Sequence, residues 1–462
     1  MIQIDSRIQP SDLADAISAM WHQSAAKILS NEQTAPALAA SPVFTVEGRY
    51  VAQGWTEWTQ GFQYGSAILQ FDATGDEVFL DIGRDNTVER MAPHLTHVGV
   101  HDHGFNNVST YGNLRRLMLE GRLPHDRREL EMYELALKAS GAVQAARWSC
   151  TADDHGYIYS FNGPQSLFSD TIRSLRALAM AHRLGHCLMG ENDEPVCLLG
   201  RLIQHARTTA KYNVYDGSGR DVYDVRGRVA HESIFNLNDG RYRCPSTQQG
   251  YSPFTTWTRG LAWIMVGYAE QLEFLETCDD AGLEAHGGRS EIERFMLDAA
   301  RASCDYYIEH TPTDGVPYWD TGAPGLKYMG DYLDRPAEPA NDHEPVDSSA
   351  AAIACQGLVR LGRYLEGKGE SAAGARYQRA GLTVLRTLLQ TPYLSVEADH
   401  QGLLLHTVYH RPRGWDHVPA GVKVPRGESC MWGDYHLRES ALHVQRLLGD
   451  RPYYCFFGPT DQ

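Results

Sequence analysis

An amide, a guanidinium and an indole gather at the start of one predicted helix. Gln249 lies in the polar, glycine-containing loop 246–252, and Arg259 follows ten residues later. Trp263 comes one helical turn after Arg259, and side chains four apart share a helix face. A guanidinium matches a carboxylate in a bidentate way, and an indole offers a flat apolar face to a sugar ring. The spacing predicts a pocket for an anionic sugar, although a helix start with a core tryptophan would show the same pattern.

Two aspartates stand in segments where a carboxyl group could do acid–base chemistry. Asp102 lies between His101 and His103 and is followed by a glycine, and Asp170 precedes an apolar helical stretch. A carboxyl pair is the usual apparatus of glycoside chemistry. Burial of Asp170 would raise its pKa, as a general acid at neutral pH requires. Each aspartate would equally suit a capped turn or helix start. The two histidines lack a third metal ligand at recognisable spacing, so no metal site is predicted.

The composition is that of a soluble globular protein. The chain has 462 residues, 42% of them hydrophobic and 22% charged, with a formal net charge of −16. This charge argues against nucleic acid or an anionic membrane surface as a partner, because phosphate binding needs a basic face. We find no apolar run of membrane-spanning length and no signal-peptide pattern, so a cytoplasmic location is expected. The nine scattered cysteines favour a reducing compartment.

Helical periodicity recurs along the whole chain, while strand-like alternation is scarce. The number of helices with similar connections indicates helix pairs that close into an α/α toroid, in a single domain over residues 1–462. We therefore predict an all-α fold with a small β-hairpin insertion. The predicted helices cover residues 12–29, 131–139, 165–185, 196–210, 256–275 (amphipathic), 291–310, 348–365, 373–390 and 432–447.

Three further segments depart from helical patterning. Residues 222–235 alternate and are followed by a turn at 238–240, which predicts a β-hairpin. Residues 321–346 and 410–428 form two long loops rich in proline, glycine and charge. Loops of this length in a compact protein are usually functional or mobile.

Eight segments stand out in order along the chain: Trp58–Phe62, His101–Phe105, Ser169–Thr171, Thr247–Ser252, Trp257–Trp263, Asp347–Ala354, Gly402–His406 and Trp432–Tyr435. Together they resemble the unsaturated glucuronyl hydrolases of glycoside hydrolase family 88. The resemblance implies an (α/α)6 barrel that removes an unsaturated uronic acid from the non-reducing ends left by polysaccharide lyases, without metal or cofactor.

By the same resemblance, Asp170 is expected to be the general acid/base and Asp102 the second essential carboxylate. Phe161 stands near the position where the family usually has an active-site tryptophan, and His103 replaces an aliphatic residue, which puts the substrate subsites in question. The expected substrate-binding residues are His101, His231, Gln249, Arg259, Trp263, Trp58 and Phe161.

Other functions remain open at this point. An unsaturated rhamnogalacturonyl hydrolase has a similar barrel, and a conventional glucuronidase would use the same carboxyl pair on saturated substrates. A sugar epimerase or lyase on an α/α toroid is a different class, in which His101 and His231 would exchange a carbon-bound proton. A carbohydrate-binding toroid without activity needs only the aromatic side chains. The aglycone, the sulfation preference and the oligomeric state are not predicted.

Overall fold

The computed structural model describes residues 1–34, 40–53, 57–449 and 451–458, and it is mostly helical as predicted. Ten long helices supply most of the structure, and shorter helices connect them. The long helices are α1 (Ala14–Thr34), α2 (Gln60–Thr74), α3 (Glu77–Arg90), α7 (Arg127–Ala146), α10 (Leu198–Tyr212), α11 (Thr258–Leu275), α13 (Arg289–Glu309), α14 (Ser348–Gly367), α15 (Ser371–Leu388) and α16 (Met431–Arg446). The shorter ones are α4 (Ala92–Leu95), α5 (His103–Asn107), α6 (Asn113–Leu119), α8 (Thr171–Ser174), α9 (Arg176–Arg183) and α12 (Asp280–Glu284).

The strands are short, antiparallel and confined to connections between helices. Three strands form one sheet in the order β5 (Ser166–Phe168), β8 (Glu232–Phe235) and β9 (Tyr242–Ser246). Within it Phe168 pairs with Glu232, and Glu232 pairs with Ser246. Strand β5 of this sheet ends at Phe168, two residues before Asp170. The two-stranded pairs are β1 (Pro42–Val46) with β2 (Arg49–Ala52), β3 (Trp148–Cys150) with β4 (Gly156–Ile158), and β6 (Leu188–Met189) with β7 (Pro195–Val196).

Two predicted elements differ from the structure. Residues 165–185 were expected to form one helix, but they begin with β5, because an apolar run of this length suits a buried strand as well as a helix. The predicted hairpin 222–235 is wrong in position, since the hairpin is β8–β9 around residues 236–241. Upstream, the Asp224 carboxylate accepts backbone N–H bonds from Gly217, Gly219 and Arg220 at 2.9, 2.8 and 2.7 Å and holds that stretch as a loop.

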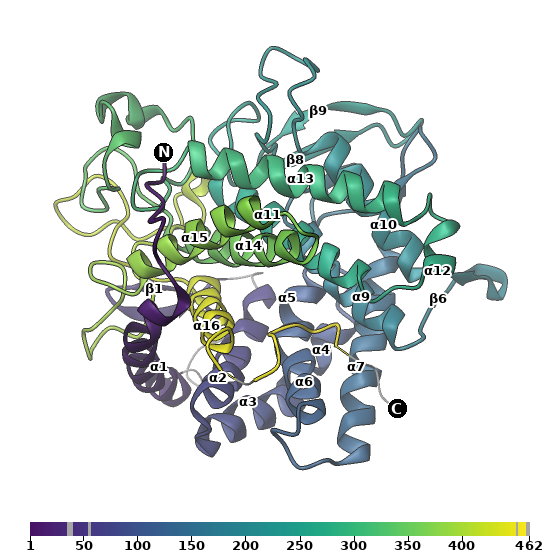
Figure 1. Cartoon of the computed structure of the whole chain (residues 1–462), viewed down its shortest axis with the longest axis horizontal. Coiled ribbons are helices and arrows are strands. Elements are labelled where there is room, and N and C mark those ends of the chain that lie inside the picture. Colours follow the sequence, from purple (N-terminus) through teal and green to yellow (C-terminus); the bar gives the residue numbers. More distant parts are fainter. Residues whose placement is uncertain (35–39, 54–56, 450, 459–462) are drawn as a thin grey trace.

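The centre of the molecule is formed by helices α11, α14 and α16. Helix α11 packs against α13 and α14, and α14 packs against α15 and α16. Figure 1 shows these central helices with α13 on one side and α1, α2 and α3 on the other. Every residue of α11 is buried. The predicted amphipathic character of this helix is therefore wrong, because it has no solvent-facing side.

Charged side chains inside this core are paired with one another. Arg173 on α8 forms ion pairs with Glu270 of α11 and, at 3.0 Å, with Glu439 of α16. Arg360 on α14 lies 2.6 Å from Glu273 of α11. A buried charge is tolerated only with such a partner. The pairs connect the helix that follows Asp170 to the centre of the fold. No helix within the described ranges is long and apolar enough to cross a membrane.

Candidate active site

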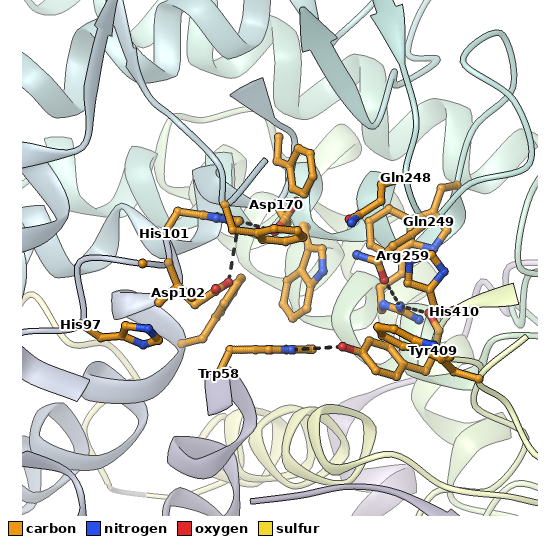
Figure 2. Close-up of a pocket in the computed structure, with 18 residues that line it drawn as sticks. Trp58, His97, His101, Asp102, Asp170, Gln248, Gln249, Arg259, Tyr409 and His410 are labelled. Carbon is orange, nitrogen blue, oxygen red and sulfur yellow. Dashed lines mark hydrogen bonds and ion pairs between the residues drawn. The ribbon is translucent and has the colours of Figure 1, made fainter. Parts of the chain in front are cut away.

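A cavity of about 420 Å³ brings together eight of the nine side chains predicted to form the site. Figure 2 shows His101 and Asp102 on one side of it, Gln249, Arg259 and His410 on the other, and Trp58 at its edge. His231 lies behind Asp170, with 3.9 Å between His231 Nε2 and Asp170 Oδ1. The lining is largely aromatic: Trp58, Phe105, Phe161, Phe168, Trp257, Trp263, Tyr409 and Trp415.

Gly104 allows the two aspartates to meet. Asp102 caps the start of α5, and its carbonyl oxygen accepts the backbone N–H of Phe105 at 2.9 Å. The Gly104 N–H donates to Ser174 Oγ at 2.8 Å, four residues after Asp170. A Cβ on Gly104 would lie 2.3 Å from the Ser174 carbonyl oxygen, a contact that no side chain permits. The glycine thus lets the start of α5 dock against α8 and places Asp102 near Asp170.

Asp170 is held as a carboxylate by the histidines around it. The residue is only 8% exposed, and burial alone would raise its pKa. The hydrogen bond from His101 Nε2 to Asp170 Oδ2, 3.0 Å long, and the charge of His101 outweigh burial and lower the pKa instead. The raised pKa that we expected for Asp170 is therefore wrong for the ligand-free protein.

The raised carboxyl pKa belongs to Asp102. Burial is the main cause, and the negative charge of Asp170 adds to it. His101 lies 3.8 Å from Asp102 through Nε2 and Oδ1. Although burial would lower the pKa of His101, the two aspartates raise it. His101, Asp102 and Asp170 therefore form one coupled group in which His101 carries a proton beside Asp170.

His231 is fixed as a hydrogen-bond donor. Its Nδ1 accepts the backbone N–H groups of Gln248 at 3.0 Å and Gln249 at 3.3 Å. A neutral imidazole that accepts at Nδ1 must carry its hydrogen on Nε2. Burial also lowers the pKa of His231 to about 4, so the ring is neutral near pH 7. Its Nε2–H then faces Asp170 and cannot act as a base.

Arg259 is not the free guanidinium fork that we expected from its spacing. It is 1% exposed, and its NH1 donates to Asp347 Oδ2 at 2.8 Å and to the Val408 carbonyl oxygen. Its NH2 donates to Gln249 Oε1 at 2.9 Å and to the Tyr409 carbonyl oxygen at 2.7 Å. The protein itself thus occupies the hydrogen-bonding groups intended for a substrate carboxylate.

This arrangement orients the Gln249 amide. Because Arg259 holds the oxygen of Gln249, the NH2 end is left to donate, and Gln249 lines the cavity. Asp347 is fully buried and caps α14 through Oδ1, which accepts the backbone N–H of Ser349 at 3.1 Å. The start of α14 therefore supports the loop that presents Gln249.

The predicted aromatic residues line the cavity and also pack against the core. Trp58 stacks on Trp432 with 5.0 Å between ring centroids, and Trp263 lies 4.8 Å from Phe105. Phe161 stacks on His101 at 5.9 Å. These side chains thus have a packing role whether or not they also contact a sugar.

Ten cavity residues were not among the predicted site residues: His97, Gly99, Val100, Phe105, Phe168, Gln248, Trp257, Tyr409, His410 and Trp415. The last two belong to the long loop 410–428, whose length was the only signal that pointed to them. Asp416 holds this loop by accepting the backbone N–H groups of Tyr409 and His410. None of residues 321–346, all of which the structure describes, lines the cavity.

A buried carboxyl pair in an aromatic-lined cavity is the kind of site that enzymes acting on sugars possess. No family model matches the chain. An unsaturated glucuronyl hydrolase from Formosa agariphila is 24% identical over 395 residues, covering 85% of this chain and 81% of the relative. A relative of the same name from Bacillus sp. (strain GL1) is 25% identical over 407 residues, covering 86% of this chain and 89% of the relative.

The fold is also similar to that of solved structures. The crystal structure of the unsaturated glucuronyl hydrolase from Bacillus sp. GL1 matches with a TM-score of 0.68 and 22% identity, covering 95% of this chain and 100% of that chain. An unsaturated glucuronyl hydrolase specific for heparin matches with a TM-score of 0.70 and 18% identity, covering 94% of this chain and 98% of that chain. The resemblance indicated by the eight segments is thus confirmed, and with it the glycoside hydrolase class.

Proposed function

We propose that this protein removes a 4,5-unsaturated uronic acid from the non-reducing end of oligosaccharides made by polysaccharide lyases. The observation that carries the proposal is the buried group of His101, Asp102 and Asp170, which faces the Gln249 amide across an aromatic-lined cavity. The relatives support the same substrate class, since a Streptococcus agalactiae unsaturated glucuronyl hydrolase was solved in complex with dGlcA-GalNAc6S.

The first chemical step is protonation of the double bond. In the substrate the C4=C5 bond is attached to the ring oxygen, so it is a vinyl ether and accepts a proton at C4. His101 passes a proton to Asp170 through their 3.0 Å hydrogen bond, and Asp170 delivers it to C4, which leaves Asp170 as a carboxylate for the next step. A substrate carboxylate that enters the cavity brings like charge and excludes water, and both effects raise the pKa of Asp170 toward the range a general acid needs.

The second step adds water. The cation that forms at C5 is stabilised by the ring oxygen, and a water attacks C5 while Asp170 takes its proton. The resulting hemiketal opens by cleavage of the bond between C5 and the ring oxygen, and the hemiacetal left at C1 then expels the aglycone. Asp102, which lines the cavity beside His101, forms a hydrogen bond with a ring hydroxyl. Neither a metal nor a cofactor is needed in this scheme.

The donors of the cavity suit the uronate carboxylate. The Gln249 NH2 is fixed through Arg259, so it loses little freedom when it binds an anion, while the His231 Nε2–H supports Asp170 from behind. Arg259 acts mainly by holding Gln249, while Trp58, Trp263 and Phe161 offer apolar faces for the ring. The substrate is therefore an anionic sugar with an apolar ring face.

Two alternatives fit the geometry less well. An epimerase would need His231 as a base, but backbone N–H groups hold its Nδ1 and leave Nε2 protonated. An inverting glucuronidase leaves about 6.5–9.5 Å between its carboxyl groups for a water. Here ligand oxygens of Asp102 and Asp170 lie within 4.8 Å of each other. A retaining glucuronidase and an unsaturated rhamnogalacturonyl hydrolase remain for experiment to separate.

The proposal extends to the finer features of the fold and location. We propose that the helices form an (α/α)6 barrel in a single catalytic domain over residues 1–462, and that the enzyme acts in the cytoplasm on lyase products taken up by the cell. The similarity to unsaturated glucuronyl hydrolase structures over nearly the whole chain supports the barrel.

The decisive experiment is isotope labelling of the product. Incubation with unsaturated disaccharides in deuterated, 18O-labelled water should place deuterium at C4 and 18O at C5. A saturated glucuronide should be a poor substrate, because it develops no charge at C5 for the site to stabilise. Label at C1 with none at C5, or equal turnover of the saturated glycoside, would point to a conventional glucuronidase. Turnover of an unsaturated rhamnogalacturonyl disaccharide alone would favour that hydrolase.

A further inference from the structure

We propose that His101, Asp102 and Asp170 also form a binding site for a divalent transition-metal ion, with Zn²⁺ as the best fit, and that this ion excludes substrate. The inhibitory part of the proposal rests on the proposed function, whereas the metal site itself does not.

The ligand atoms have the spacing of a zinc site. His101 Nε2 lies 3.0 Å from Asp170 Oδ2 and 3.8 Å from Asp102 Oδ1, and the three ligand atoms lie within 4.8 Å of one another. Bonds of about 2.0–2.2 Å to a tetrahedral Zn²⁺ put neighbouring ligand atoms roughly 3.3–3.6 Å apart. Shifts of under an ångström therefore suffice, and the open fourth position faces the cavity.

The burial and charge of the group favour a metal over a solvated cluster. The exposed fractions of His101, Asp102 and Asp170 are 1%, 7% and 8%. Two carboxylates balance the charge of one divalent ion. One nitrogen ligand and a coordination shell of three side chains suit Zn²⁺, whereas Ca²⁺ and Mg²⁺ prefer six or more oxygen ligands.

A second shell for this site is already in place. Asp170 Oδ1 and His231 Nε2 are buried and lack a hydrogen-bond partner among the described residues. They lie 3.9 Å apart, so the fixed Nε2–H of His231 can support Asp170 when its other oxygen binds a metal. His103 is not a ligand, because its ring nitrogens bond to Ser140 Oγ and the His97 carbonyl oxygen, each at 3.0 Å.

The surroundings of His101 Nδ1 make this an inhibitory, reversible metal site rather than a structural one. A histidine that binds zinc usually donates its other ring nitrogen to a fixed acceptor. The buried His101 Nδ1 has no such partner within the described part of the chain. Metal affinity is therefore weaker than in a structural zinc site. An ion here occupies the carboxylate that exchanges the proton with substrate, so it blocks catalysis directly.

The test uses the full chain after EDTA treatment and dialysis. Titration calorimetry with Zn²⁺ should show one site, and Co²⁺ should give the visible absorption of a low-coordinate ion, without any substrate. Asp102→Asn and Asp170→Asn should each weaken Zn²⁺ binding at least about 10-fold. Removal of a residue that only supports a metal ligand already costs about 10-fold or more, so removal of a ligand should cost no less. Both substitutions keep the side-chain shape, and circular dichroism checks the fold.

The control variant addresses the competing zinc site on the surface. Cys197 Sγ lies 3.9 Å from His286 Nε2, and this exposed pair is the obvious place for adventitious zinc. Cys197→Ser should leave both the calorimetric site and the inhibition unchanged. Wild-type affinity in both Asn variants, or loss of the site in Cys197→Ser, would overturn the proposal.

Kinetics on the wild-type enzyme provide an independent measurement. Zn²⁺ should raise the apparent KM for an unsaturated disaccharide without lowering kcat, EDTA should restore activity, and Mg²⁺ should have no effect. A purely non-competitive pattern would refute the exclusion of substrate. If no unsaturated disaccharide is cleaved but Co²⁺ still binds through Asp102 and Asp170, the proposed function fails while the metal site stands.

Discussion

Arg259→Lys tests whether the arginine acts on substrate through Gln249. A lysine can keep one charged contact with Asp347, but a single ammonium on a flexible stem cannot also reach Gln249 Oε1 and the two carbonyl oxygens of residues 408 and 409. The substitution therefore frees the Gln249 amide to rotate while the helix around position 259 remains buried.

The expected magnitudes come from the hydrogen bonds that are lost. Bonds to a charged group contribute about 1.5–3 kcal/mol each, so the loss of these three lowers the free energy of unfolding by about 4.5 kcal/mol or somewhat more. For a chain of 462 residues, an unfolding entropy near 2.1 cal/mol/K per residue converts this to a fall in Tm of about 5 °C. Loss of the oriented Gln249 donor should cost about 10- to 150-fold in kcat/KM.

The assay is a double-mutant cycle with Gln249→Ala. Each single variant should raise KM for an unsaturated disaccharide more than it lowers kcat, since both remove a contact to the uronate carboxylate. If Arg259 works through Gln249, the double variant loses little more than either single variant, because the same interaction is removed twice. Circular dichroism and thermal melts on the same samples separate binding from stability.

Additive losses in this cycle would refute the reasoning. Additivity would mean that Arg259 contacts the substrate independently of Gln249 and that its protein contacts open when substrate binds. An unchanged Tm in Arg259→Lys would also contradict it, since the buried carbonyl oxygens would then have found other donors.

Three other predictions follow from the same structure. Asp170→Asn should keep the fold and lower kcat by about 10²–10⁴-fold, and activity within a few-fold of wild type would remove Asp170 from the mechanism. Gly104→Ala should lower the free energy of unfolding by about 1–3 kcal/mol and reduce activity, because its Cβ meets the Ser174 carbonyl oxygen; Gly367→Ala, with open space around its Cβ, is the matched control and should melt as wild type. Burial lowers the pKa of His103 to about 4, whereas the same imidazole in the unfolded chain has a pKa near 6.5. Because the unfolded chain therefore takes up this proton first, the free energy of unfolding should keep its full value above about pH 6.5 and fall as the pH drops toward 4. A Tm that rises on acidification over this window would contradict that sign. Burial also lowers the pKa values of His205, His406 and His436, so these histidines add to the same loss of stability at low pH.

The long helices were predictable where one face is polar. The patterns at 291–310 and 373–390 became α13 and α15 within about two residues at each end, since local periodicity is enough to define an amphipathic helix. Helix α2 was not predicted, because most of its residues are buried and it carries little alternation of polar and apolar faces. Strand β5 was taken for helix because only its pairing with β8 distinguishes the two.

The candidate site was likewise predictable only where its residues stand out in the local sequence. The residue types at 101–104, 170, 249, 259 and 263 pointed to acid–base chemistry on an anionic sugar, and eight of the nine predicted side chains line one cavity. Local sequence could indicate these residues because loops and helix starts with unusual polar groups are themselves local features. For His410 and Trp415 it offered only the length of their loop, which contacts around Asp416 bring to the cavity.

What the sequence by itself determined was a mostly helical chain with two aspartates, histidines, an amide and indoles placed at element boundaries. What only the tertiary structure decided was the state and partner of each group. His101 meets Asp170 from 69 positions away and reverses the pKa shift that burial alone would cause. Arg259 finds Asp347 88 positions away and becomes a support for Gln249. Protonation and hydrogen bonding depend on distances between atoms, and for groups so far apart along the chain only the packing of the helices sets those distances.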